Sequence, residues 1–199
     1  MKPIVQCEEE PKKRDMEGVV SRHLLDSRTI LLSGSIDDKQ AHKIVGQMLV
    51  LDEISKEETI TLIINSGGGS ISSGFAIFDT IQMIDAPVRT VGTGVVASMG
   101  VTIFLAVPKE QRFSLPNTRF MIHQPLISGT MVAPASDLEI NAREMIKLRD
   151  RLNHLIAGAT GQPLKAVESD TQRDFWLDAA EATDYGIVGK VVSARSELG

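Results

Sequence analysis

The sequence predicts an α/β fold, because strands and helices are expected to alternate along a chain of 199 residues. Short runs rich in β-branched residues, such as TITLIIN, alternate with longer segments whose apolar residues recur at helical spacing. The connections between them are short, and none is low in complexity. Such alternation is typical of crossover units around a largely buried sheet. The length fits one domain, or a compact domain with a small appendage.

The N-terminal third predicts an arm, a strand and a helix. Residues 1–17 mix EEE with KKR and contain two prolines, so we expect a mobile arm there and a single domain over 18–199. RTILLSG at 28–34 predicts a strand. The segment 37–55 predicts a helix, since it spaces its apolar residues helically: Ala41, Ile44, Val45, Met48 and Leu49.

The middle of the chain repeats the strand–helix pattern twice. TITLIIN at 59–65 predicts a strand that SGGGS breaks, and a helical pattern resumes over 71–84. PVRTVGTG at 87–94 predicts the next strand, and an apolar helix is expected over 97–106.

The last third contains another strand, at 117–126, and the longest expected helix, at 136–160. We expect that helix to begin at Ser136, because SDLE has the form of a capping box, and to end at Gly161. The remaining elements are two short helices and a strand, expected over 163–170, 178–186 and 187–193.

Composition argues against several classes of function. The net charge is -5 and aromatic residues make up only 4%, which does not favour a nucleic-acid surface. No run approaches the roughly 20 apolar residues of a membrane span, and the N-terminal residues show no secretory signal pattern. Cys7 is the one cysteine, which fits a reducing compartment. We therefore expect a cytoplasmic protein that binds neither nucleic acid nor membrane.

Metal and nucleotide sites find little support. The four histidines, His23, His42, His123 and His154, form no HExxH motif and lie near no cysteine pair, so no metal site is expected. GGGSISSG follows a strand but lacks the lysine of a P-loop. GTGVVA at 92–97 does fit G-x-G-x-x-A after a strand, and a dinucleotide site remains a competitor there.

Two glycine-containing turns could hold an oxyanion instead. SGGGS and VASMG both follow strands and precede helices, where backbone N–H groups lack intrahelical partners. Ser98 lies in the second turn, which matches only half of the nucleophile-elbow pattern G-x-S-x-G. These patterns leave Ser98 open between a nucleophile and a buried serine bonded to the backbone.

A general base and its carboxylate are equally open. His123 lies at the end of an apolar strand, just before Pro125, where it could face a cleft or be a core histidine. Four carboxylates follow along the chain: Glu168, Asp170, Asp174 and Asp178. A serine hydrolase needs one carboxylate to orient the histidine, and spacing does not choose among them.

Several motifs, taken in order, resemble one known family. INSGGGSISSGFAIFDTIQ, GVVASMG, LPNTRFMIHQPL, DLEINARE and TGQPLKAVESDTQRDFWLDAAEATDYGIV are similar to the proteolytic subunits of the ATP-dependent Clp protease, the ClpP family. The resemblance covers about 21–192. It implies a crotonase-like fold of repeated ββα units with a protruding handle, here at about 124–160.

The resemblance also implies a serine endopeptidase that cleaves unfolded polypeptides to short peptides. It assigns the nucleophile to Ser98, the general base to His123 and the orienting carboxylate to Asp174. The N–H groups of Gly69 and Met99 would form the oxyanion hole.

Further roles follow from the same resemblance. Gly68, Ile71 and Leu126 would bind an extended peptide substrate, and Arg173 would contact the opposite ring. Family members form two stacked heptameric rings, here alone or mixed with a paralogue, that receive substrates from an AAA+ unfoldase of the ClpX, ClpA or ClpC type. The unfoldase uses ATP, so no cofactor is expected in this chain.

Some positions depart from the family pattern. Gly67 stands where the family usually has proline, and Ile127 and Ser128 replace a glycine pair near the substrate. Thr61 and Ile63 stand where tyrosines are frequent in the unfoldase docking pocket. These departures keep a conditionally active or silent ring subunit as the leading alternative. An acyl-CoA enzyme of the crotonase type and a Ser-Lys peptidase are further alternatives, disfavoured by the MIHQP motif.

Overall fold

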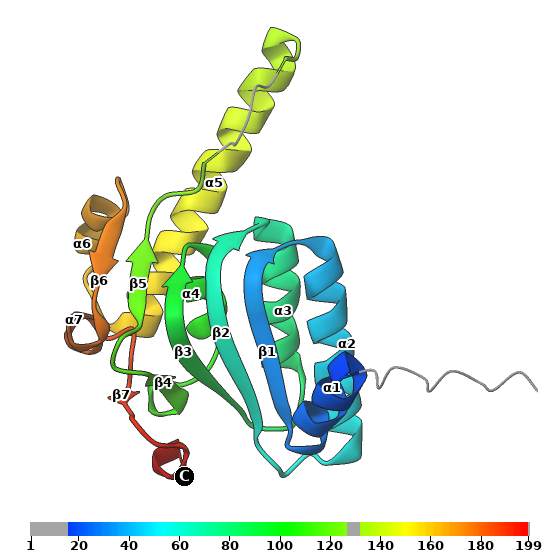
Figure 1. Cartoon of the computed structure of the whole chain (residues 1–199). Helices are drawn as coiled ribbons and strands as arrows, with labels where there is room; N and C mark the ends of the chain where they lie inside the picture. Colours follow the sequence, from blue (N-terminus) through cyan, green and yellow to red (C-terminus); the bar gives the residue numbers. More distant parts are fainter. Residues whose placement is uncertain (1–15, 127–131, 199) are drawn as a thin grey trace, which may run out of the picture.

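The computed structural model describes residues 16–126 and 132–198 (Figure 1). Ile127, Ser128 and the first 15 residues of the expected arm lie outside these ranges. The described part begins with a helix at Met16, which no pattern in the sequence had predicted.

The described elements largely follow the predicted order. The strands are β1 (Thr29–Ile36), β2 (Ile60–Gly69), β3 (Val88–Ala97), β4 (Arg112–Ser114), β5 (Arg119–Ile122), β6 (Phe175–Leu177) and β7 (Lys190–Val191). The α-helices are α1 (Met16–Asp26), α2 (Asp38–Ile54), α3 (Ile71–Met83), α4 (Met99–Phe104), α5 (Ala135–Thr160), α6 (Leu164–Asp170) and α7 (Ala179–Tyr185), and the 3₁₀ turns are η1 (Lys109–Gln111) and η2 (Arg195–Leu198).

The sheet is mostly parallel, which confirms the predicted α/β class. Its strand order is β1-β2-β3-β4-β7. β3 divides its pairing, because residues 90–92 pair with β4 and residues 95–97 pair with β5. β6 then adds to β5 in the antiparallel direction. The carboxyl end of β3 therefore leads toward a small second branch of the sheet.

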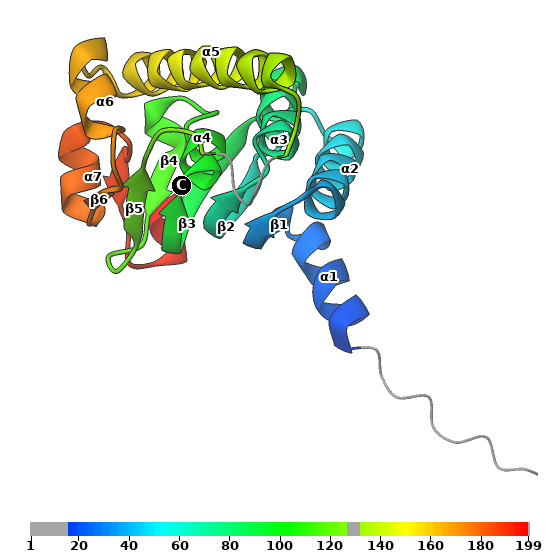
Figure 2. The ribbon, with the colours of Figure 1, turned by 90° about the horizontal axis from the view of Figure 1, so that it is seen from above.

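Helices α2, α3 and α4 cover one face of the sheet, and α5 crosses outside α4 (Figure 2). Strand and helix side chains such as Leu32, Ile64 and Ile103 are fully buried between these layers. The C-terminal half of α5 contributes Leu152 and Ile156 to this core. Its N-terminal half rises beyond the body of the molecule, as Figure 1 shows.

The start of α5 differs from the prediction, whereas its end does not. The helix begins at Ala135 behind Pro134, so Ser136 already lies inside the first turn and cannot act as an N-cap, which needs non-helical dihedrals. The predicted capping box at Ser136 is therefore wrong. Gly161 is the predicted C-cap and has φ +78°. A capping box does form in α7, between Asp178 and Glu181.

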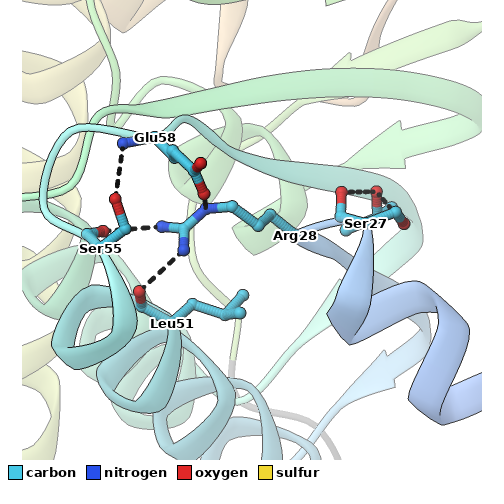
Figure 3. Close-up of polar contacts among 6 residues, drawn as sticks. Ser27, Arg28, Leu51, Ser55 and Glu58 are labelled. Carbon is cyan, nitrogen blue, oxygen red and sulfur yellow. Dashed lines mark hydrogen bonds and ion pairs between the residues drawn. The ribbon is translucent and has the colours of Figure 1, made fainter.

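Arg28 joins α1 and β1 to the end of α2 (Figure 3). It is a non-glycine residue with φ +50° and is only 9% exposed. Its guanidinium donates hydrogen bonds to the carbonyl oxygens of Leu51 (3.0 Å) and Ser55 (2.9 Å), and Nε lies 3.8 Å from Oε2 of Glu58. A cation at the C-terminus of a helix also complements the helix dipole.

Candidate active site

Ser98 occupies the turn between β3 and α4. Its backbone has φ +55° and ψ -123°, so it belongs to neither element, and α4 starts at Met99. The N–H of Ser98 donates to the carbonyl oxygen of Met121 in β5 at 2.8 Å. The turn is thereby attached to the strand that leads to His123.

His123 links Ser98 to a carboxylate. Its Nε2 lies 2.8 Å from Oγ of Ser98, and its Nδ1 lies 3.1 Å from Oδ1 of Asp174. The His123 side chain is 16% exposed and that of Asp174 is 62% exposed. The three side chains form one continuous hydrogen-bonded chain that opens to solvent at the carboxylate.

The pairing of β5 with β6 explains why Asp174 is the carboxylate beside His123. Met121 pairs with Trp176 and Ile122 pairs with Phe175. One more step in this antiparallel register sets His123 opposite Asp174.

Gln124, just after β5, is bonded to the loop that carries Asp174. Its backbone N–H donates to the carbonyl oxygen of Thr171 (2.6 Å), and its side-chain amide donates to the carbonyl oxygen of Gln172 (3.0 Å). These bonds hold the residues around His123 against the loop that carries Asp174.

The other candidate carboxylates lie elsewhere. Asp170 accepts a hydrogen bond from the hydroxyl of Tyr185 at 2.9 Å, and Asp178 caps α7. Burial, together with the hydrogen bond to Asp170 and the charge of that carboxylate, raises the pKa of Tyr185 above its ordinary value. Glu168 lines a separate small cavity beside α6. The structure thus brings one of the four carboxylates to His123.

The SGGGS segment does not break β2, contrary to the prediction. The strand continues to Gly69, and both Gly68 (φ +97°) and Gly69 (φ +154°) adopt backbone conformations that favour glycine. A Cβ atom on Gly68 would lie 2.7 Å from the Cβ of Ser98 and 3.1 Å from the backbone nitrogen of Met99. The glycine-rich end of β2 and the turn at Ser98 therefore lie in direct contact, as the oxyanion hypothesis requires.

An open cleft of about 1160 Å³ lies beside these residues. Its lining includes Ser98, His123, Gly69, Ile71, Phe75, Leu126 and Arg151. Leu126 is 61% exposed, whereas Gly68 is buried and is not among the residues that line the cleft. Arg173 and Asp174 line an adjoining hollow of about 470 Å³ that also reaches His123. The cleft is large enough for several residues of an extended peptide.

The dinucleotide motif loses its structural context. Residues 92–97 lie within β3, and no helix begins among them. A dinucleotide fingerprint needs its glycines in a strand-to-helix turn, so the hypothesis of a dinucleotide site at GTGVVA is wrong. Among the residues that the structure describes, no three His, Cys, Asp or Glu side chains gather as a metal site would need. Across 16–126 and 132–198, no helix combines the length and apolar character of a membrane span.

A second apolar hollow lies away from the cleft. It has a volume of about 360 Å³ and is lined in part by Leu24, Thr61, Ile63, Val91 and Leu198. Thr61 and Ile63 are the two positions where the sequence departs from the expected docking pocket, and the structure places both in this hollow.

Ser66 is a buried polar residue that no motif in the sequence singles out. Ser66 continues the inward-facing phase of β2 after Ile60, Leu62 and Ile64, and all four side chains are buried. A serine in the apolar phase of a period-two pattern was the signal that could have drawn attention to it.

Comparison with known proteins gives a consistent result. The family model described as Clp protease matches residues 12–195. The ATP-dependent Clp protease proteolytic subunit 3 of Rhizobium johnstonii is 47% identical over 176 residues, which cover 88% of this chain and 89% of that protein. Subunit 2 of Treponema pallidum is 44% identical over 198 residues, or 98% of both chains.

A solved structure agrees as well. A ClpP1 mutant from Listeria monocytogenes superposes with a TM-score of 0.83 at 47% identity, over 90% of this chain and 99% of that one. At this identity the likeness extends beyond the fold alone.

Proposed function

The chain belongs to the Clp protease family, and we propose that Ser98, His123 and Asp174 are its catalytic triad. As a Clp protease proteolytic subunit, it is a serine peptidase. One observation supports the assignment above all others: the unbroken hydrogen-bonded chain from Asp174 through His123 to Oγ of Ser98.

The geometry suits nucleophilic catalysis. His123 takes the proton of Ser98 at Nε2 as Oγ attacks a peptide carbonyl carbon, and it later gives that proton to the leaving amine. Asp174 accepts a hydrogen bond from Nδ1–H, which holds the neutral ring in the required tautomer and stabilises the imidazolium form. Water then hydrolyses the acyl-enzyme, with His123 again as the base.

The N–H groups of Gly69 and Met99 are the proposed oxyanion donors. Met99 is the first residue of α4, and Gly69 is the last residue of β2. The contact of Gly68 with Ser98 and with the backbone nitrogen of Met99 supports this role, because it brings the glycine segment of β2 next to the start of α4.

The cleft supports binding of an extended, unfolded polypeptide. Ile71 and Leu126 line it beside Ser98, and the buried Gly68 packs against Ser98. We propose that these residues bind the substrate in an extended form and that a chain must be unfolded to enter.

We further propose that the subunit works inside a particle of two stacked heptameric rings. The projecting half of α5 carries exposed Leu138, Ile140 and Ile146, which a neighbouring copy could cover. Arg173, beside Asp174, is the proposed contact to the opposite ring. The apolar hollow at Thr61 and Ile63 would receive an AAA+ unfoldase, which hydrolyses the ATP, in the cytoplasm.

A conditionally active subunit is the second candidate. The relatives in Rhizobium johnstonii and Treponema pallidum are numbered subunits 3 and 2, which is how paralogues in one organism are named. In this version the triad of Ser98 becomes productive only when a paralogous ring is present.

Labelling with a fluorophosphonate tests both candidates. The wild type and Ser98→Ala are labelled and then separated by particle size. We expect the wild type to label in ring-sized particles and Ser98→Ala not to label. Labelling that needs an added paralogue or unfoldase supports the conditional version, whereas a wild type that never labels in any state contradicts the triad.

A further inference from the structure

Ser66 is a buried polar residue whose hydrogen-bonding capacity is used. It is 1% exposed, and its hydroxyl donates to the carbonyl oxygen of Gly34 at 2.6 Å. The same oxygen accepts the backbone N–H of Gly68 at 3.0 Å. One side chain thus bridges β1 and the glycine segment of β2.

The bridge lies where the ladder between β1 and β2 loses its register. Ser33 pairs with Asn65, but Ser35 pairs with Gly68. Two residues of β2 therefore stand opposite the single residue Gly34, which is a β-bulge. A bulge interrupts the ladder hydrogen bonds, and here the hydroxyl of Ser66 supplies bonds across the interruption.

The bulge is in contact with the catalytic turn on two sides. Gly68 packs against Ser98 and Met99, as described above. The carbonyl oxygen of Ser66 itself would lie 3.2 Å from a Cβ atom on Gly100, in the first turn of α4. Ser66 therefore contacts both backbone segments that carry the proposed oxyanion donors, yet it does not line the cleft, because its hydroxyl is buried between Gly34 and Gly68.

We propose that Ser66 is a positioning residue for peptide hydrolysis, because its hydroxyl holds Gly68 and thereby sets where the N–H of Gly69 points. This inference rests on the proposed function of Gly69 and Met99 as oxyanion donors. An oxyanion hole acts through donors that are fixed before the reaction. A small shift of one donor therefore reduces the stabilisation of the transition state more than it reduces the affinity for substrate.

The test compares Ser66→Ala with Ser114→Ala in the assembled protein. Ser114 is a matched control, since it is also fully buried and its hydroxyl makes one hydrogen bond, to the carbonyl oxygen of Leu115 at 2.9 Å. Steady-state cleavage of a short fluorogenic peptide gives kcat and KM. Inhibition by a peptide aldehyde, whose adduct with Ser98 places an oxygen in the oxyanion hole, reports on the hole directly.

We expect Ser66→Ala to lower kcat by about 10- to 100-fold while KM changes by less than about threefold. The affinity for the aldehyde should fall by a similar factor, and that for the non-covalent product peptide should not. Ser114→Ala should keep both kinetic constants within about twofold of the wild type. A Ser66→Ala enzyme whose kcat stays within about threefold of the wild type overturns the proposal.

Hydrogen exchange separates this inference from the proposed function. In Ser66→Ala the amides of residues 66–70 should exchange at least about tenfold faster than in Ser114→Ala, whether or not Ser98 is reactive. Unchanged exchange refutes the role of Ser66 alone, whereas a wild type that never reacts with a fluorophosphonate refutes the triad. If Ser66→Ala does not fold, Ser66→Cys replaces it, because the thiol is a poorer acceptor of nearly the same size.

Discussion

Gly68 packs on Ser98 so closely that a Cβ atom on Gly68 would lie 2.7 Å from the Cβ of Ser98. The same atom would lie 2.9 Å from the carbonyl oxygen of Ala97, and Gly68 has φ +97°. We expect Gly68→Ala to force the two turns apart and to lower kcat by about 100-fold or more, because small displacements of catalytic groups have effects of that size. Steady-state cleavage of a short fluorogenic peptide measures kcat.

Gly67→Ala is the matched control for that variant. Gly67 is exposed, has no positive φ, and nothing lies within 4 Å of a Cβ atom placed on it. Its kcat should remain within about twofold of the wild type. Equal losses in the two variants would mean that the contact with Ser98 is not what matters.

Asp174→Asn should lower kcat by about 10⁴-fold with little change in KM, because the amide favours the wrong tautomer of His123. Asp178→Asn is the control, since Asp178 caps α7 and lies four residues further along the chain. Asparagine is also a good N-cap, so that variant should keep its activity. An Asp174→Asn enzyme with nearly full kcat would remove Asp174 from the proposed triad.

Tyr185 should make the protein less stable at alkaline pH. Its pKa is raised by burial first, then by its hydrogen bond to Asp170 and by the charge of that carboxylate. The unfolded chain loses this proton near pH 10, whereas the folded chain keeps it to higher pH. The protonated Tyr185 therefore contributes its full share of the unfolding free energy below about pH 10, and this contribution is lost as the pH rises above that value. The free energy of unfolding in urea should therefore fall more steeply above about pH 10 in the wild type than in Tyr185→Phe.

The titration can also be followed directly. Tyr185 is the single tyrosine of the chain, so the phenolate absorbance reports on it alone. A midpoint near the ordinary value of about 10 in the folded protein would contradict the raised pKa.

At position 28, glycine should give a more stable protein than alanine, which is the reverse of their usual order in stability. Arg28→Ala and Arg28→Gly both remove the hydrogen bonds to Leu51 and Ser55, which should cost about 2–3 kcal/mol of unfolding free energy. Only glycine relieves the backbone at φ +50°, so Arg28→Gly should be about 1 kcal/mol more stable than Arg28→Ala. Urea unfolding at neutral pH measures both, and a more stable Arg28→Ala would show that the left-handed backbone carries no penalty.

Much of the fold could be predicted because its main elements are locally encoded. The β-branched run at 59–65 and the helical spacing in 37–55 indicate their elements without reference to the rest of the chain. β4 and β6 could not be found in this way, since each has three residues and exists through pairing with distant strands. The N-cap of α5 is Pro134, so the helix begins before the position that the apparent capping box at Ser136 indicated.

The site was only partly accessible from patterns in the sequence. Ser98 and His123 could be recognised as candidates, but four carboxylates remained open until the family resemblance singled out Asp174. The structure brings that residue to His123 through the register of β5 and β6, which joins positions 51 residues apart. Such a register depends on tertiary pairing, so spacing along the chain cannot supply it.

Ser98 and Arg28 are the non-glycine residues with positive φ in the described part of the chain. Hydrogen bonds of the guanidinium compensate at Arg28, but α4 has no side-chain cap at Ser98. A glycine at position 98 would relax the backbone by about 1–3 kcal/mol and would remove the attacking oxygen at the same time. Selection for stability alone would therefore favour glycine at position 98 and give an inactive enzyme. Only selection for turnover retains the serine there.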